Sequence, residues 1–526
     1  MLRDEDVPVE LNLASWFVDR NVVEGRGDRT ALVTNDGPTT YAELAALVNR
    51  VGNGLLDLGV RQQQRILLAL SDGVELVATW WAGQKIGAVT AEAYTYLQPK
   101  DYAYFLDYTQ AEVVVADAVT LDALREARAA SRHLRHLLVV GVPEDRLQPG
   151  ERSFEGLVAT APADLDPAPT TRDDVAIWKF TTGTTGRPKA CVHPTRSSLL
   201  SFEAYARGVL DIGQDDLVLP VPKLFFGYAR DLAALYPLGV GGAGVVFPER
   251  TTAERIFDLI ARHRPTILVN VPTMMSAMVA HPEAAEQDLS CLRLCTSAGE
   301  ALPAELHRKW DRTFGVDVVD GIGSSEAYHI YISNRPGHGR AGTVGQVVPG
   351  YTARVVDDAG DAVPDGEVGV LEVTGPTVAQ GYWEAPEQSA ATFHGDTVRT
   401  GDLFVRDADG FFTYRGRADD LLKVGGIWVA PSEVEDCLIG HPDVLECAVV
   451  GHEHEGLVRP RAYVVTRPGA VVAAEALIEH ARSMLAPHKR PRDVHFVTEL
   501  PRTANGKLDR QMLRELDRDQ SGSSAP

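Results

Sequence analysis

The chain of 526 residues has little cysteine and no surplus of positive charge. Its five cysteines are odd in number and irregularly spaced, which excludes a disulfide framework and favours reduced thiols. Lys and Arg total 51 against 73 for Asp and Glu, a formal net charge of −22, so neither a nucleic acid nor an anionic membrane is an expected partner. No apolar run reaches the ~20 residues that span a bilayer, and no signal peptide is visible. We therefore expect a soluble, cytoplasmic protein.

Short apolar strands alternate with helical stretches in the middle of the sequence. Segments 266–270, 292–295 and 316–319 are typical of strands, and a polar loop or a proline-led helix follows each of them. Strands that alternate with helices predict an α/β fold with a largely parallel sheet. Ligands of such sheets gather at the carboxyl ends of the strands, so these polar loops are the expected place of a site.

The pattern changes after about residue 355. Alternating strands and Asp-Gly turns predict a β-rich subdomain over about 345–418. Residues 419–526 alternate between helix and strand and are numerous enough to form a small α+β domain. We therefore expect a large N-terminal domain, residues 1–418, and a separate C-terminal domain, residues 419–526.

A loop rich in hydroxyl groups follows the strand predicted over 175–180. It contains Thr181, Thr182, Gly183, Thr184, Thr185, Gly186 and Lys189. Glycines let backbone N–H groups converge on an anion, and the hydroxyls and the lysine add donors and charge, so phosphate is the expected ligand. The spacing is not that of a Walker A loop. A second string, 239–244, matches G-x-G-x-x-G, but a strand-like segment follows it where a dinucleotide site needs a helix, so we interpret it as a turn.

The threonine-rich loop resembles the phosphate loop of the adenylate-forming, AMP-binding superfamily, which includes acyl- and aryl-CoA synthetases. Four later segments are also similar to that superfamily and follow in its order: 320–326, 399–402, 414–420 and 501–507. The resemblance implies that the protein joins a carboxylate to ATP, releases pyrophosphate, and passes the acyl-AMP to a thiol. ATP, Mg²⁺ and coenzyme A are the implied cofactor and co-substrates.

The resemblance also assigns catalytic roles. Lys507 would bridge the carboxylate and the α-phosphate, which repel one another. Glu326 and Thr184 would hold Mg²⁺, an ion that prefers oxygen ligands. Asp419 would be the hinge about which a mobile C-terminal domain turns after adenylation, and Lys423 would then lie near the thiol channel.

The resemblance further places the nucleotide. Asp402 would bind both ribose hydroxyls with Arg417 beside it, and Ser325 would lie in the same site. The residues of the implied adenine slot are Gly299, Glu300, Ala301, Asp320, Gly321 and Ile322.

Two segments, 223–228 and 328–334, look like the acid-pocket segments of benzoate-CoA ligases. The residues that would line the acid slot are Phe226, Gly227, Tyr228, Ala298, Gly323, His329 and Ile330. Small side chains at Ala298 and Gly323 would leave a flat space in which aromatic residues stack on a ring. Because Arg230 and Asp231 follow Tyr228, we hypothesise that one of them recognises a polar ring substituent, such as an amino or hydroxyl group.

The acceptor of the activated acid is less well specified by the motifs. Coenzyme A is the leading expectation. The thiol of a separate carrier protein and an amine are the alternatives, since all three acceptors share the first half-reaction. A homodimer is expected only from the resemblance.

Overall fold

The computed structural model describes residues 3–182, 187–424, 427–454, 457–467, 469–502 and 508–522. A seven-stranded sheet occupies the first part of the chain, and its strands are parallel except for the last pair, β8 and β9. In spatial order they are β7 (Glu151–Ser153), β6 (His136–Val140), β5 (Val113–Asp117), β3 (Arg65–Ala69), β4 (Val89–Glu92), β8 (Val175–Thr182) and β9 (Pro188–Pro194). The predicted strand over 175–180 is confirmed as the beginning of β8.

A second, nine-stranded sheet is parallel in its centre and antiparallel at its ends. In spatial order its strands are β16 (Gln346–Val347), β15 (Ile330–Ser333), β14 (Val318–Gly323), β13 (Leu294–Ser297), β12 (Ile267–Asn270), β10 (Leu217–Pro220), β11 (Ala243–Val245), β1 (Thr30–Thr34) and β2 (Gly37–Thr40). The three strands predicted over 266–319 are β12, β13 and β14, and the last two begin about two residues later than expected.

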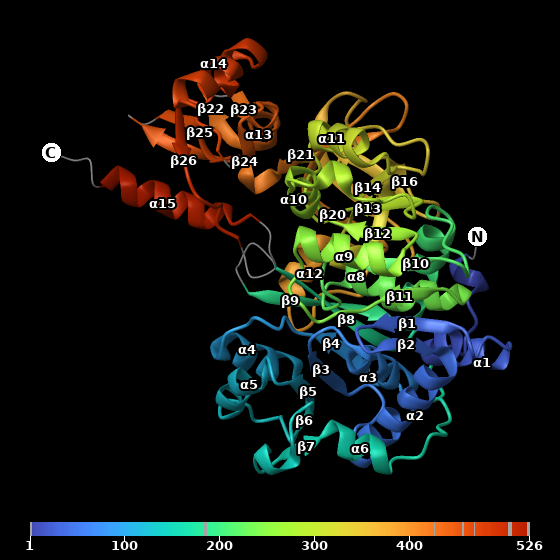
Figure 1. Cartoon of the computed structure of the whole chain (residues 1–526). Coiled ribbons are helices and arrows are strands. Elements are labelled where there is room, and N and C mark those ends of the chain that lie inside the picture. Colours follow the sequence, from blue (N-terminus) through green and yellow to red (C-terminus); the bar gives the residue numbers. More distant parts are fainter. Residues whose placement is uncertain are drawn as a thin grey trace.

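Helices cover both faces of each large sheet, as a doubly covered parallel sheet requires. One core joins the two sheets through α2 and α3, a second lies under α4 and α5, and a third lies under α9 and α11 (Figure 1). The helices of this part are α1 (Arg20–Val23), α2 (Tyr41–Asp57), α3 (Val74–Lys85), α4 (Pro99–Thr109), α5 (Leu121–Arg128), α6 (Phe154–Thr160), α7 (Thr195–Ser201), α8 (Gly227–Arg230), α9 (Ala253–His263), α10 (Pro272–Ala280) and α11 (Ala304–Phe314). The layered α/β arrangement confirms the predicted fold class.

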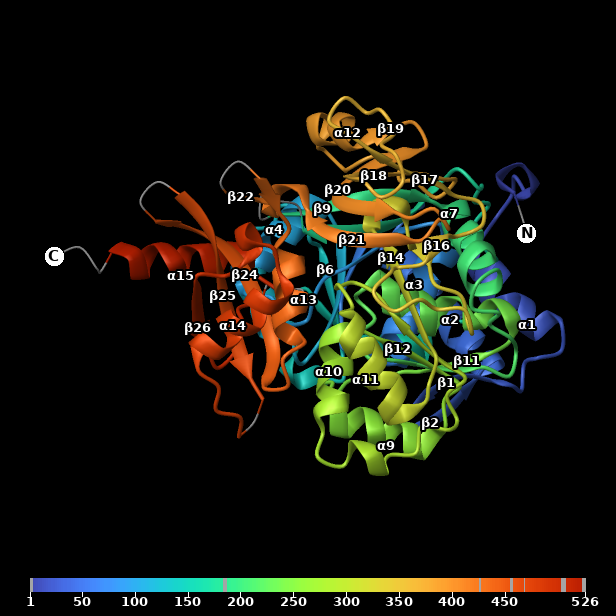
Figure 2. The ribbon, with the colours of Figure 1, turned by 90° about the horizontal axis from the view of Figure 1, so that it is seen from above.

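An antiparallel five-stranded sheet follows, with α12 (Pro386–Thr392) beside it. Its strands are β17 (Thr352–Val356), β18 (Val368–Thr374), β20 (Thr397–Arg406), β19 (Phe393–His394) and β21 (Phe412–Arg417). Figure 2 shows this sheet, in orange, along one edge of the larger N-terminal part.

The C-terminal residues form a small domain that stands to one side (Figures 1 and 2). Its elements are β22 (Leu422–Val424), β23 (Ile427–Val429), α13 (Pro431–Ile439), β24 (Val444–His454), β25 (Leu457–Thr466), α14 (Ala474–Met484), β26 (Asp493–Phe496) and α15 (Arg510–Gly522). It has its own apolar core, which includes Val434, Val449 and Leu477. None of the helices in the described ranges combines the length and apolar content that crossing a bilayer requires.

The glycine string 239–244 is explained by close packing. Gly241 has a positive φ of 78°, and a Cβ at Gly244 would lie 1.8 Å from the carbonyl oxygen of Ala233. β11 follows the turn directly, so no helix is present to receive a phosphate group. The sequence predicts a turn between strands; the turn at Gly241 is confirmed, but a 3₁₀ helix, Pro237–Val240, and not a strand precedes it.

We expect Gly244→Ala to destabilise the protein by about 1–3 kcal/mol or more, because the added methyl group would have to displace backbone. Denaturant midpoints of the two proteins measure the effect. The matched control is Gly27→Ala, whose new Cβ would meet its nearest neighbour at 3.6 Å. Equal midpoints for the Gly244→Ala variant and the wild type would contradict this explanation of the string.

Candidate functional site

The residues of the predicted adenine slot, together with Ser325, lie at or just beyond the carboxyl ends of β13 and β14. Ser297, the last residue of β13, pairs with Asp320 on β14, so the segment from Ala298 and the 320–323 segment leave the sheet side by side. The loop after β14 reaches the other large sheet, because Ser325 Oγ donates to the carbonyl of Phe180 at 3.2 Å. Buried His193 on β9 contacts the carbonyl of Ser325 through Nε2 at 2.7 Å. The site therefore lies where the ends of two sheets meet.

Part of the threonine-rich loop lies outside the described residues. The described part of β8 ends with Thr181 and the backbone of Thr182. Lys189 is the second residue of the return strand β9, and its Nζ lies 4.2 Å from the ring centroid of Tyr382. The predicted residues Gly183, Thr184, Thr185 and Gly186, and the side chain of Thr182, are not among the described groups.

Glu326 is held from two directions by the segment before α12. Its Oε1 accepts a hydrogen bond from the Tyr382 hydroxyl at 2.7 Å, and its backbone carbonyl accepts one from the Ala379 N–H at 2.8 Å. Tyr382 thus contacts both Glu326 and Lys189. It was not predicted as a site residue, because 56 residues separate it from Glu326 along the chain.

Asp402 and Arg417 face each other across the antiparallel pair β20–β21. Arg417 Nη1 donates to Asp402 Oδ1 at 3.2 Å and to the carbonyl of Thr400 at 3.1 Å. Buried Tyr331 lies within electrostatic range of both residues and of Glu326, so the structure brings these three predicted residues to one region. The five-stranded sheet thereby contributes to a site whose other side chains come from the large sheets.

Asp320 is a buried carboxyl group at the base of the predicted adenine slot. Burial raises its pKa to about 8, although the Ser297 hydroxyl and the Gly321 N–H oppose this shift. Within the described part of the chain, its Oδ1 has no hydrogen-bond partner. The adjacent Gly321 and Ile322 continue β14 and pair with β15. A buried carboxyl group with a raised pKa and an oxygen without a partner can form a hydrogen bond with the polar edge of a ligand.

The C-terminal domain contacts the predicted adenine slot. Glu300 Oε2 accepts a hydrogen bond from the Thr273 hydroxyl at 2.5 Å, and Arg502 Nη1 donates to the same hydroxyl at 3.3 Å. Arg502 precedes Lys507 by five residues, but Lys507 lies outside the described ranges. The side chains of Lys423 and Asp419 are likewise not described, although β22 and the 3₁₀ turn Ala418–Asp420 carry their backbones.

The predicted acid slot contains a cluster of aromatic rings around His329. The ring centroids of Tyr205, Tyr228 and Tyr236 lie 5.1–5.7 Å from that of His329, and the Tyr228 hydroxyl bonds Thr296 Oγ1 at 2.6 Å. Burial lowers the pKa of His329 to about 3, so the imidazole is neutral near pH 7. Its Nε2 contacts the Tyr228 carbonyl at 3.3 Å, while Nδ1 has no partner among the described groups. Tyrosine rings and a neutral imidazole are groups that pack well against a planar aromatic group.

The remaining slot residues are small or apolar. Ala298 and Ile330 are buried, Phe226 packs on Phe225 and Tyr94, and Gly227 begins α8. A Cβ at Gly323 would lie 2.3 Å from the carbonyl oxygen of His329. Gly323 is therefore required by the close approach of two backbones, which differs from the expectation that it opens space for a ring.

Arg230 and Asp231 belong to a buried chain of four charged side chains, together with Glu92 and Lys179. Arg230 pairs with Glu92 and with Asp231, and Asp231 Oδ2 accepts from Lys179 Nζ at 2.5 Å. Because both residues are fully engaged inside the protein, the structure does not support the hypothesis that either one recognises a ring substituent. Lys179 was not predicted, although a lysine within the apolar segment 175–180 was a visible signal.

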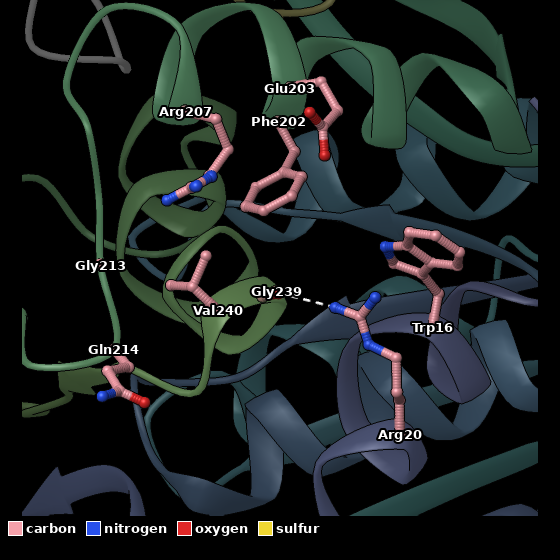
Figure 3. Close-up of a pocket in the computed structure, with 9 residues that line it drawn as sticks. All are labelled: Trp16, Arg20, Phe202, Glu203, Arg207, Gly213, Gln214, Gly239 and Val240. Atoms are coloured by element: carbon pink, nitrogen blue, oxygen red, sulfur yellow. Dashed lines mark hydrogen bonds between the residues drawn. The ribbon is translucent and has the colours of Figure 1, made fainter. Parts of the chain in front are cut away.

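A cavity of about 360 Å³ is lined by other residues than those predicted for the site (Figure 3). Its walls include Trp16, Arg20, Phe202, Glu203 and Arg207. Arg20 lies over the Trp16 ring and donates to the carbonyl of Gly239 at 2.7 Å, so this guanidinium is already engaged. Gly239 and Val240 of the glycine string line it, but none of the predicted site residues that the structure describes does so, and it is not the candidate site.

Two family models match most of the chain. The model of the AMP-binding enzyme family matches residues 19–383, and the model of the AMP-binding enzyme C-terminal domain matches residues 433–507. The chain is 41% identical to the benzoate–CoA ligase of Thauera aromatica over 515 residues, which cover 97% of this chain and 96% of that relative.

Two solved structures are similar over nearly the whole chain. The anthranilate CoA ligase AuaEII in complex with anthranoyl-AMP has a TM-score of 0.95 at 38% identity and covers 98% of this chain and 99% of its own. A benzoate CoA ligase from Burkholderia xenovorans LB400 has a TM-score of 0.89 at 39% identity, covering 96% of this chain and 100% of its own. The ordered motifs, the layered α/β fold and these full-length matches together show that the chain belongs to the family of AMP-binding enzymes.

Proposed function

We propose that the protein is an AMP-forming ligase that activates an aryl carboxylic acid of the benzoate type and transfers it to coenzyme A. Amino- and hydroxy-benzoates are included in the proposed substrate class. The observation that carries the proposal is the full-length similarity to benzoate and anthranilate CoA ligases, joined to an aromatic cluster at the predicted acid slot. Transfer to a carrier-protein thiol or to an amine remains the alternative, since it would use the same first half-reaction.

In the first half-reaction, the acid carboxylate attacks the α-phosphate of ATP, and pyrophosphate leaves. The threonine-rich loop and Lys189 would hold the phosphates, and Asp402 with Arg417 would hold the ribose. Gly299, Glu300, Ala301, Asp320, Gly321 and Ile322 would form the adenine slot, with Ser325 beside it. Lys507 would reduce the repulsion between the two anions, and the rate would then depend on alignment of the reacting atoms.

The proposed acid slot places an uncharged aromatic surface beside the reacting carboxylate. Tyr228 and the neutral His329 would contact the ring, while Ala298, Ile330 and Phe226 would exclude water from it. Exclusion of water strengthens the electrostatic interactions of the reacting groups. The unpartnered Nδ1 of His329 would accommodate rings that bear a hydrogen-bonding substituent.

A magnesium ion is part of the proposal, and the donor set fits it. Mg²⁺ in phosphate-transfer sites is held by one or two carboxylates together with the substrate phosphates, so a site need not contain a cluster of acidic residues. Among the described residues, no group of three or more His, Cys, Asp or Glu is arranged to hold a metal. Glu326 would supply the carboxylate and Thr184 a hydroxyl, and the ion would neutralise charge on the phosphates when bound.

We also propose that the C-terminal domain, residues 419–526, moves about a hinge at Asp419 between the two half-reactions. Contact between Arg502 and Thr273 supports an arrangement in which the Lys507 segment lies near the nucleotide. After adenylation the domain would turn, Lys507 would leave, and the segment around Lys423 would line the path of the thiol. One site would thus be used twice by a domain that changes its position.

Pyrophosphate release tests the proposed substrate class. With ATP, Mg²⁺ and coenzyme A present, we expect benzoate or its amino and hydroxy derivatives to give kcat/KM values about 100-fold or more above those of butyrate and octanoate, because only a planar ring fills the slot. An aliphatic acid that matches or exceeds every aryl acid would contradict the proposal.

A further inference from the structure

The backbone makes a strained turn at Tyr328, between Glu326 and His329. Tyr328 has φ 72° and ψ −56°, and the His329 N–H bonds the carbonyl of Ala327 at 2.9 Å. These values describe a three-residue γ-turn with positive φ, which is rare and costly for a residue with a bulky side chain. Such strain persists only where the surroundings hold it, and it concentrates at functional sites.

Lys179 contacts both the backbone and the ring of Tyr328. Its Nζ donates to the Tyr328 carbonyl at 2.6 Å and lies 3.5 Å from the centroid of the Tyr328 ring. The tyrosine hydroxyl is fixed separately by Ser198 Oγ at 2.8 Å. The ammonium group therefore holds the carbonyl in the direction that the strained turn requires. Gly227 leaves room for this side chain, since a Cβ there would lie 3.0 Å from Nζ.

The lysine is in turn held by buried Asp231, which also pairs with Arg230, and Arg230 pairs with Glu92. The side chains of all four residues are at most 5% exposed, and their two positive and two negative charges balance. Burial lowers the pKa of Lys179 to about 8, and burial would raise that of Asp231, but Arg230 and Lys179 hold the Asp231 pKa below its usual range. Both members of the Lys179–Asp231 pair are therefore ionised near pH 7. Buried ion pairs contribute little net stability, which points to a role in defining a local conformation.

Glu326 and His329 are fixed differently. Glu326 precedes the turn and is anchored by Tyr382 and by the Ala379 N–H, independently of the turn. His329 is the last residue of the turn, and its placement among Tyr205, Tyr228 and Tyr236 depends on the direction in which the backbone leaves Tyr328. Replacement of Lys179 should therefore displace His329 in the acid slot more than it displaces the carboxylate of Glu326.

We propose that Lys179 is a positioning residue: with Asp231, it holds the γ-turn at Tyr328 and thereby fixes His329 in the slot that receives the acid. This inference rests on the proposed function for the identity of the slot. The lysine itself touches neither the acid nor the nucleotide. Its effect is on the affinity and selectivity for the acid, and not on the binding of ATP.

The test compares Lys179→Met with the double variant Lys179→Met/Asp231→Asn, which removes one positive and one negative charge together. Pyrophosphate exchange gives KM for the acid and for ATP. We expect the acid KM to rise about tenfold to hundredfold, as a misplaced slot residue predicts, and the ratio of kcat/KM between benzoate and its hydroxy derivatives to change. The ATP KM should stay within about twofold of the wild-type value.

The matched control is Lys85→Met, because Lys85 is also a buried lysine, paired with Asp19 and Asn49 far from the site. It should lose stability without any change in the acid KM. If the double variant is folded and its acid KM and acid selectivity equal those of the wild type, the positioning role is wrong. If Lys179→Met and Lys85→Met lower kcat alike and leave both KM values unchanged, the role is only structural. A wild-type protein that activates no aryl acid would instead contradict the proposed function.

Discussion

Replacement of Lys507 by alanine is expected to reduce acid-dependent pyrophosphate exchange by about 10²–10³-fold or more, the loss seen when one group that stabilises charge in a transition state is removed. The reason is electrostatic. The acid carboxylate and the α-phosphate are both anionic, and Lys507 is the residue to which the resemblance assigns the bridge between them. Stopped assays of ATP–pyrophosphate exchange at saturating acid measure the effect.

The same variant should retain the second half-reaction. When synthetic aryl-AMP and coenzyme A are supplied, thioester formation should remain within a few-fold of the wild-type rate, because Lys507 would have left the site by then. Lys100→Ala, on the exposed side of α4, is the control for loss of a lysine charge elsewhere. Exchange by Lys507→Ala near the wild-type rate would refute the assigned role, and equal loss of both half-reactions would argue against domain movement.

Replacement of Glu326 by glutamine should lower adenylation by about 10²-fold and raise the Mg²⁺ concentration needed for half-maximal rate, because a carboxylate ligand of a hard cation is removed. The amide of the Glu326→Gln variant retains an oxygen that can accept the hydrogen bond from Tyr382, so the local fold should be preserved. A Mg²⁺ titration of the initial rate at fixed ATP measures both quantities.

Glu387→Gln on α12 is the matched control, since Glu387 is exposed and lies close to Tyr382 in the sequence. Its Mg²⁺ dependence should equal that of the wild type. If Glu326→Gln also shows an unchanged Mg²⁺ dependence, Glu326 does not hold the ion. Thermal unfolding of both variants, compared with the wild type, separates loss of a ligand from loss of fold.

The α/β class and the three strands predicted over 266–319 were accessible from the sequence because apolar periodicity is local. The spatial order of the strands was not predicted, because it depends on pairing between distant segments. β13 and β14 also end later than predicted, at Ser297 and Gly323. Each of these ladders extends into the polar motif that follows the apolar segment, so Ser297 and Asp320 pair with each other although their side chains are polar. Sequence patterns indicate where apolar residues end, whereas backbone pairing decides where a strand ends.

The support around the site was not predictable from local patterns. Tyr382 bonds Glu326 across 56 residues, and Lys179 bonds Asp231 across 52, so neither contact leaves a spacing signal. Because Arg230 and Asp231 follow Tyr228 in the sequence, we expected one of their charged side chains to face the ligand. In the fold, Glu92 on β4 and Lys179 on β8 come from neighbouring strands of the seven-stranded sheet. They form ion pairs with Arg230 and Asp231, and all four side chains are buried in the protein interior.

The central claim is that this protein converts an aryl acid, ATP and coenzyme A into an aryl-CoA thioester, AMP and pyrophosphate. Mass spectrometry of the complete reaction with benzoate and its 2-amino and hydroxy derivatives tests it most directly. We expect an aryl-CoA thioester and AMP to accumulate in equal amounts, dependent on both the acid and coenzyme A. The absence of any aryl-CoA, with the aryl-AMP either missing or captured only by an amine or a carrier protein, would contradict the account.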